Sequence, residues 1–185
     1  MQTTNFMETI LDELQMAAGY ISNQEAEELV NKILESKKIF VAGAGRSGLM
    51  ARSFVMRLMH VGLEAYVVGE TVTPNFENKD TLIICSGSGE TKSLVSIAEK
   101  AKNIGGTIVV ITTSPESRIG QLADRTIKMP GSPKDQAKGD YRTIQPMGSL
   151  FEQTLLLFYD ATILRIMDKK ELDTTKMYGK HANLE

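Results

Sequence analysis

The chain has 185 residues, 42% of them hydrophobic, which is enough for one well-packed core and too few for several domains. Its 21 basic and 23 acidic residues leave a net charge of −2, so we expect neither a nucleic acid nor a membrane as partner. The single cysteine, Cys85, excludes an internal disulfide framework and suits a reducing compartment, so we expect a cytoplasmic protein. Cys85 ends an apolar strand and is expected to be buried and unreactive.

Two helices are expected before the first strand. Apolar residues recur every four positions from Phe6 to Leu14, which is the period of an amphipathic helix. Ser22 and Glu25 have the spacing of a capping box, so they mark the start of a second helix that ends before Lys37.

Two segments then repeat one design, in which a hydrophobic strand runs into a Gly/Ser loop that opens a helix. The loops read GAGRSG at residues 43–48 and SGSGET at residues 86–91. Glycines allow a tight turn and a close approach to a ligand, and the free N–H groups of a first helical turn attract anions. The hydroxyls of Ser86, Ser88 and Thr91 add donors for the oxygens of a phosphate monoester. Together the loops predict a phosphorylated small molecule as the ligand.

The remaining segments alternate between strands and helices. Further strands are predicted at residues 65–68, 108–111 and 126–129. Helices are predicted from the first loop to about Gly62, from the second loop to about Ile104, and from Pro115 to Leu122. This alternation is typical of a parallel sheet that is covered by helices on both faces.

The last third of the chain adds a loop and a long helix. Residues 130–148 show little periodicity and predict a long loop, which we interpret as a lid. The helix from Leu150 to Met167 is apolar on nearly all sides, which a surface helix of a small monomer does not tolerate. We therefore expect a homo-oligomer in which this helix lies at or beside an interface.

The glycine loops also have other interpretations. The first one fits the dinucleotide-binding fingerprint, and Glu70 stands near the position where an acid meets a ribose hydroxyl. This hypothesis leaves the serine-rich second loop unexplained, and no residue set suggests hydride transfer. Tight turns between strands and helices also require glycine when nothing binds to them.

At the level of motifs, the chain resembles the sugar isomerase (SIS) domain and, more narrowly, the 6-phospho-3-hexuloisomerase family over nearly its whole length. The motifs of the narrower resemblance lie at residues 43–49, 56–60, 68–70, 86–91, 145–153 and 181–185. The resemblance implies an α/β fold: a three-layer, doubly wound sandwich around a largely parallel five-stranded sheet. The chain would be one such domain, with a helical pair at 1–36, an α/β core at 37–168 and a tail at 169–185.

The resemblance also implies an activity. It is the interconversion of D-arabino-hex-3-ulose 6-phosphate and D-fructose 6-phosphate, in the ribulose monophosphate route of formaldehyde fixation or in pentose supply. The family implies no metal or organic cofactor and a homotetramer. Carried over by motif, Glu152 would be the base, and His181 would assist proton transfers at oxygen, in its own or a neighbouring subunit's site. The implied substrate-binding residues are Gly45, Arg46, Ser47, Ser86, Gly87, Ser88 and Thr91.

The chemistry requires removal of the C2 proton, a cis-2,3-enediol and return of a proton to C3, and one carboxylate can perform both transfers. Glu152 has an alternative role, because Ser149 and Glu152 also have capping-box spacing. Arg46 is expected to contact substrate, or alternatively to pair with Glu70 or another acid. We expect no catalytic role for His60, which lies near a helix C-terminus.

Two alternative functions stay open at this point. One is a non-catalytic phosphosugar-binding regulator, which needs no general base. The other is a different sugar-phosphate isomerase of the same fold, such as a phosphoheptose or arabinose 5-phosphate isomerase. His181 also has a purely structural interpretation, because chain ends are often frayed.

Overall fold

The computed structural model describes residues 2–131, 141 and 143–184. Most of the loop that we interpret as a lid lies outside these residues, so that interpretation stays a prediction. Within the described ranges, every helix is too short or too polar to span a lipid bilayer.

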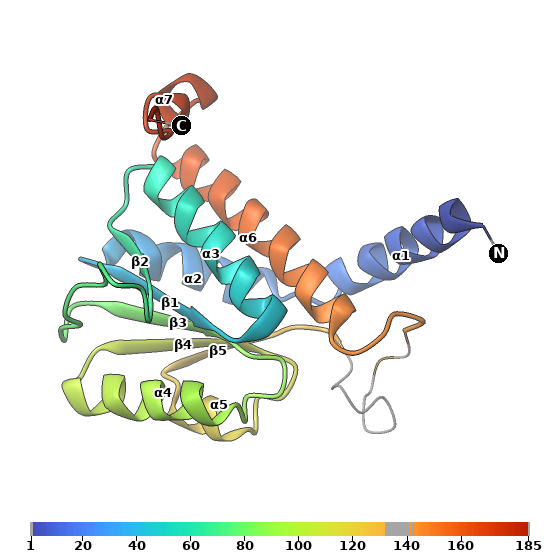
Figure 1. Ribbon diagram of the computed structural model, residues 1–185, viewed down its shortest axis with the longest axis horizontal. Coiled ribbons are helices and arrows are strands. Elements are labelled where there is room, and N and C mark those ends of the chain that lie inside the picture. Colours follow the sequence, from blue (N-terminus) through green and yellow to red (C-terminus); the bar gives the residue numbers. More distant parts are fainter. Residues whose placement is uncertain (1, 132–140, 142, 185) are drawn as a thin grey trace.

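The core of the fold is a five-stranded, fully parallel sheet with the strand order β2-β1-β3-β4-β5 (Figure 1). The strands are β1 (Ile39–Gly43), β2 (Ala65–Val67), β3 (Thr81–Cys85), β4 (Thr107–Thr112) and β5 (Arg125–Lys128). The helices are α1 (Thr3–Ala18), α2 (Asn23–Glu35), α3 (Gly45–His60), α4 (Lys92–Ile104), α5 (Arg118–Leu122), α6 (Ser149–Lys169) and α7 (Thr174–Tyr178). The expectation of a doubly wound α/β fold is confirmed.

Helices cover both faces of the sheet and divide the core into two halves. Helices α2, α3 and α6 lie on one face, and α4 and α5 lie on the other (Figure 1). Successive strand residues alternate between the halves: Val41 and Ile83 pack toward α3 and α6, whereas Ala42 and Ile84 pack toward α4. Because both faces are buried, the strands read as continuous apolar runs in the sequence.

Helices α3 and α6 pack along each other. The rings of Phe54 on α3 and Tyr159 on α6 stack with their centroids 4.0 Å apart, and both side chains are buried. This contact joins the middle of α3 to the middle of α6, so the two helices run along each other beside the site described below.

Three local predictions need correction. Helix α5 begins at Arg118, after Ser117, whose hydroxyl accepts a hydrogen bond from the Gly120 N–H; Pro115 lies before the helix. Helix α7 was not predicted, because its five residues are too few to show an apolar period. The capping box at Ser22 is only half formed, since its hydroxyl accepts from the Glu25 N–H while the Glu25 carboxylate turns to β5.

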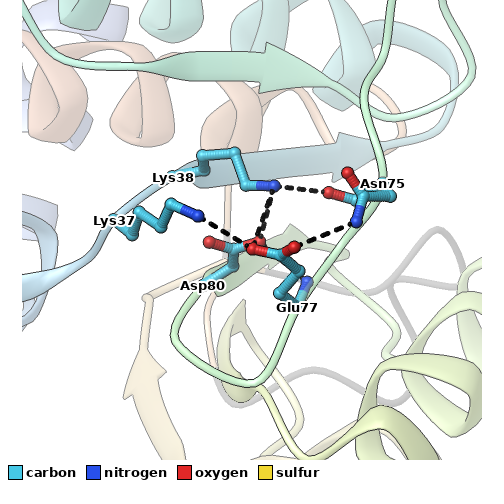
Figure 2. A network of polar contacts seen from close by, with 5 residues as sticks. All are labelled: Lys37, Lys38, Asn75, Glu77 and Asp80. Carbon is cyan, nitrogen blue, oxygen red and sulfur yellow. Dashed lines mark hydrogen bonds and ion pairs between the residues drawn. The ribbon is translucent and has the colours of Figure 1, made fainter.

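A buried ion pair fastens the end of the sheet at which β1 and β3 begin (Figure 2). The Lys38 ammonium lies 3.3 Å from the Asp80 carboxylate and donates to the Asn75 carbonyl at 2.7 Å. Asp80 also accepts from the Glu77 N–H at 2.8 Å, and the exposed Lys37 pairs with Glu77 at 3.0 Å. The network therefore ties the connection between β2 and β3 to the sheet, at the edge opposite the glycine loops.

Candidate active site

The two glycine loops meet at the point where the strand order of the sheet reverses. Strands β1 and β3 are neighbours, and Gly43 at the end of β1 pairs with Cys85 at the end of β3. From β1 the chain passes through α3 to β2 on one side, and from β3 it passes through α4 to β4 on the other. Because α3 and α4 lie on opposite faces, the loops diverge and leave a crevice, which is where open α/β sheets bind ligands.

A cavity of about 460 Å³ occupies this crevice, between the two loops and the first turn of α6. All seven predicted substrate-binding residues and the predicted base line it. The lining residues are Ala44, Gly45, Arg46, Ser47, Cys85, Ser86, Gly87, Ser88, Thr91, Leu94, Gly148, Phe151 and Glu152. The structure therefore brings together residues that lie more than one hundred positions apart in the sequence.

The first loop is tight because α3 starts directly against the end of β1. A Cβ on Gly48 would lie 2.7 Å from the Gly43 carbonyl oxygen, and a Cβ on Gly43 would lie 2.6 Å from the Cys85 sulfur. The Cys85 thiol donates to the carbonyl oxygens of Ala42 and Ser47. Burial raises the pKa of Cys85 to about 12, so the thiol stays protonated and serves as packing beneath the loop, as expected.

The hydroxyls of the second loop are preorganised to donate into the cavity. The Ser86 Oγ accepts from the Gly89 N–H at 3.1 Å, and the Ser88 Oγ accepts from the Glu90 N–H at 3.3 Å. Each hydroxyl is thus held as an acceptor and keeps its own hydrogen for another partner. Thr91 stands at the N-cap position of α4, where its side chain makes no capping bond.

Two threonines at the end of β4 support this loop, and the sequence analysis missed them. The Gly87 carbonyl oxygen accepts from the hydroxyls of Thr112 and Thr113, at 3.0 and 2.8 Å, and from the Thr113 N–H at 3.1 Å. These threonines turn the Gly87 peptide so that its carbonyl points away from the cavity toward β4. Their position directly after a buried strand, at the same edge of the sheet, was the signal that would have found them.

Glu152 does not cap its helix. Gly148 is the N-cap residue of α6, the Ser149 N–H donates to the Pro146 carbonyl, and Glu152 lies beyond the reach of a capping box. The capping alternative is therefore wrong. One Glu152 carboxylate oxygen lies instead 3.2 Å from the Arg46 guanidinium, which also donates to the Ser149 hydroxyl at 3.0 Å.

The charges of the cavity lining are one cation and one anion, Arg46 and Glu152. The Arg46 side chain is 48% exposed while that of Glu152 is 15% exposed, so the guanidinium reaches over a carboxylate that is largely covered. The alternative that Arg46 pairs with an acid is confirmed, but the acid is Glu152 and not Glu70, which pairs with Arg52. A group bound in the crevice would contact Arg46 before it reached Glu152.

His181 is the one predicted site residue that the structure does not bring to this cavity within one chain. Its ring stacks on His60 with centroids 5.5 Å apart, near Met167 at the far end of α6. At 1.5 Å per residue, Glu152 and Met167 are roughly 22 Å apart along the helix. Burial, with the nearby charge of Arg57, lowers the pKa of His60, which makes it a neutral packing partner for the tail at pH 7.

Comparisons with known proteins identify the family of this chain. The family model of the SIS domain matches residues 32–157. The Bacillus subtilis protein named 3-hexulose-6-phosphate isomerase is 60% identical over 185 residues, covering 100% of both chains. A Mycobacterium gastri protein of the same name is 38% identical over 182 residues, covering 98% of this chain and 91% of its own.

Among solved structures, a Methanococcus jannaschii protein superposes with a TM-score of 0.85 and 36% identity, covering 98% of this chain and 99% of its own. Its crystal structure was taken to infer a function as 3-hexulose-6-phosphate isomerase. Family model, full-length relatives and fold all point to one group of enzymes. The chain therefore belongs to the SIS domain family and, within it, to the group of proteins named 3-hexulose-6-phosphate isomerase.

Proposed function

We propose that this chain is an isomerase that interconverts D-arabino-hex-3-ulose 6-phosphate and D-fructose 6-phosphate, in the ribulose monophosphate pathway and in the cytoplasm. The observation that carries the proposal is that two phosphate-type loops and a largely covered carboxylate line one cavity. The names of the full-length relatives support the same reaction. Because the reaction moves protons only, protein side chains can carry out every step of the mechanism below.

The phosphate of the substrate binds between the two loops. The first turns of α3 and α4 direct N–H groups at it, and these groups carry the positive ends of the two helix dipoles. The hydroxyls of Ser47, Ser86, Ser88 and Thr91 donate to its oxygens. This grip fixes one end of a six-carbon chain, so the carbons at its middle lie toward the first turn of α6.

Glu152 then transfers the proton between carbons. Starting from the 3-ketose, its carboxylate removes the proton on C2, the electron pair of that bond forms the C2–C3 double bond, and O3 takes up a proton. The same carboxyl group returns its proton to C3 while O2 loses a proton, which yields the 2-ketose. In a cis-2,3-enediol one face of the C2–C3 double bond is open to one group, which can serve both carbons. Arg46 orients the carboxylate and stabilises negative charge on the substrate oxygens.

The protons on O2 and O3 need a second group, which we assign to His181 of a neighbouring subunit. Within one chain His181 lies at the opposite end of α6 from the cavity, so only another copy can supply it. Helix α1 extends away from the sheet (Figure 1). Its side chains Phe6, Met7 and Leu11 are exposed. On α6, Leu157 is 53% exposed.

A groove of about 530 Å³ lies between α1, α2 and α6. Its lining is mostly apolar, and it continues the exposed apolar surface of α1 and α6. We infer that a second copy of the chain covers this surface, because α1 projects from each copy and the groove between α1, α2 and α6 can receive it. We therefore assign the protein to a homo-oligomer, with the tetramer of the family as its form. Light scattering that finds a stable monomer would remove this assignment.

Co-expression of two inactive variants tests the shared site. We expect Glu152→Gln and His181→Ala to be impaired separately, whereas assemblies containing both chains regain part of the activity, because some sites combine an intact Glu152 with an intact His181. If both residues acted from one chain, no mixed assembly would contain an intact site. Activity that does not rise on mixing would therefore place His181 in the site of its own chain or outside catalysis.

Hydrogen exchange tests the function itself. The protein is incubated with D-fructose 6-phosphate in deuterated water, without any added cofactor. We expect deuterium to appear on a carbon of the sugar, which nuclear magnetic resonance detects. The reason is that the enediol returns to the ketose after the base has exchanged its proton with solvent. Tight binding of the sugar phosphate without exchange would instead indicate a non-catalytic phosphosugar-binding protein. Exchange with another sugar phosphate alone would indicate a different isomerase.

A further inference from the structure

We infer that Glu13 on α1 is a positioning residue for Glu152: it holds the segment that leads into α6 and so sets the place of the base. The inference rests on the proposed function, since it concerns the geometry of that reaction. Glu13 is separated from the segment by 130 residues of sequence and belongs to a helix that contributes nothing to the lining of the cavity.

The Glu13 carboxylate is the acceptor for three consecutive residues. It accepts from the Thr143 hydroxyl at 2.6 Å, from the Ile144 N–H at 2.8 Å and from the Gln145 side-chain amide at 2.9 Å. The Thr143 hydroxyl in turn accepts from the Gln145 N–H at 3.0 Å. Glu13 is 7% exposed and Gln145 is 4% exposed, so these bonds are shielded from water. We call residues 143–145 together with Glu13 the clamp.

Only two residues separate the clamp from the N-cap of α6. Met147 has a φ of +59°, a left-handed conformation that a residue with a side chain adopts rarely and that requires fixed surroundings. The Ser149 N–H donates to the Pro146 carbonyl, and the Glu152 N–H donates to the Gly148 carbonyl. The clamp therefore determines where α6 begins, and the base lies in the first turn of that helix.

The clamp requires a carboxylate rather than an amide. Three donors converge on the two oxygens of Glu13, and a glutamine in its place would direct an N–H₂ group at one of them. Burial by itself raises the pKa of Glu13, but the hydrogen bonds from Thr143, Gln145 and Ile144 outweigh it and lower the pKa. The carboxylate is therefore ionised at pH 7, and each bond to it is charge-assisted.

The test is the substitution Glu13→Gln, with deuterium incorporation into D-fructose 6-phosphate as the assay. We expect kcat to fall about 10- to 100-fold, because a misplacement of about 1 Å in the base has an effect of that size. Competitive inhibition by inorganic phosphate should stay unchanged, because the phosphate loops follow β1 and β3 and do not touch the clamp. The matched control is Glu8→Gln on the exposed side of the same helix, which should behave as the unmodified chain.

Two further variants separate positioning from general loosening. In a Glu152→Gln background, Glu13→Gln should add no further loss, because a positioning residue acts only through the group it places. Thr143→Val removes one of the three donors to Glu13. It should lower kcat by a smaller factor than Glu13→Gln and leave phosphate inhibition unchanged, so it replaces Glu13→Gln as the test if that variant fails to fold.

The inference is overturned if folded Glu13→Gln retains kcat within about twofold of the unmodified chain, or if phosphate inhibition weakens in parallel with kcat. An additional loss in the Glu152→Gln background would also contradict it. Failure of the proposed function has a different signature. In that case either the unmodified chain introduces no deuterium into D-fructose 6-phosphate, or Glu152→Gln leaves the incorporation unchanged, whatever the result for Glu13.

Discussion

Replacement of Glu152 by glutamine is expected to lower the rate of carbon-bound hydrogen exchange by about two to four orders of magnitude, the usual size of general-base catalysis. The amide has nearly the same shape, so the cavity keeps its volume, but it has no lone pair basic enough to take the C2 proton. Stability should change little, because the partner of Glu152 is the half-exposed Arg46. Inhibition by inorganic phosphate reports whether the two loops remain intact.

The matched control for this variant is Glu99→Gln, an exposed carboxylate on α4. It carries the same chemical change without contact to the cavity, and its exchange rate should equal that of the unmodified chain. Near-full exchange in Glu152→Gln would mean that the carboxylate only orients Arg46. The base would then have to be sought elsewhere in the assembled oligomer.

Substitution of Lys38 by methionine is expected to lower the free energy of unfolding by about 3–5 kcal/mol, as loss of one partner of a buried ion pair does. The Asp80 side chain is fully buried and would lose the ammonium that lies 3.3 Å from it (Figure 2). Urea denaturation at pH 7 measures this loss. The exchange activity of the folded fraction should stay unchanged, because the pair lies at the edge of the sheet opposite the cavity.

Lys37 offers a matched control from the next position in the chain. Its side chain is 60% exposed and pairs with Glu77 at the surface, so Lys37→Met should barely change the denaturation midpoint. The double variant Lys38→Met and Asp80→Asn should recover part of the lost stability, since it removes both charges. Equal effects of Lys37→Met and Lys38→Met would contradict the view that burial makes the Lys38 pair important.

The sheet could be predicted from sequence because both of its faces are buried. Strands such as residues 82–85 and 108–111 are then short continuous apolar runs, and glycine loops mark where they end. Helix starts were harder to predict. Helix α5 begins at Arg118, three positions after the expected Pro115, and α6 begins at Ser149, one position before the expected Leu150. Hydrogen bonds decide between such choices.

Part of the cavity could also be predicted from the sequence, because glycine loops mark the ends of the strands. Ser86 and Arg46 lie in loops whose glycines signal a ligand, and parallel strands bring those loops to one edge. Thr113 could have been found from its position directly after a buried strand, but its bond to Gly87 could not. The clamp by Glu13 was not predictable, because it depends on a contact between segments 130 residues apart. In the proposed mechanism His181 comes from a second copy of the chain, and the pattern of one chain does not specify how copies assemble.

The central claim is that the sugar phosphate binds with its phosphate between the two loops and its middle carbons at Glu152. A crystal structure of the Glu152→Gln variant with D-fructose 6-phosphate measures this directly. We expect the phosphate within hydrogen-bond distance of Ser86, Ser88 and Thr91, and the side chain at position 152 about 3–3.5 Å from C2 or C3. A phosphate bound outside the loops, or middle carbons out of reach of position 152, would contradict the account.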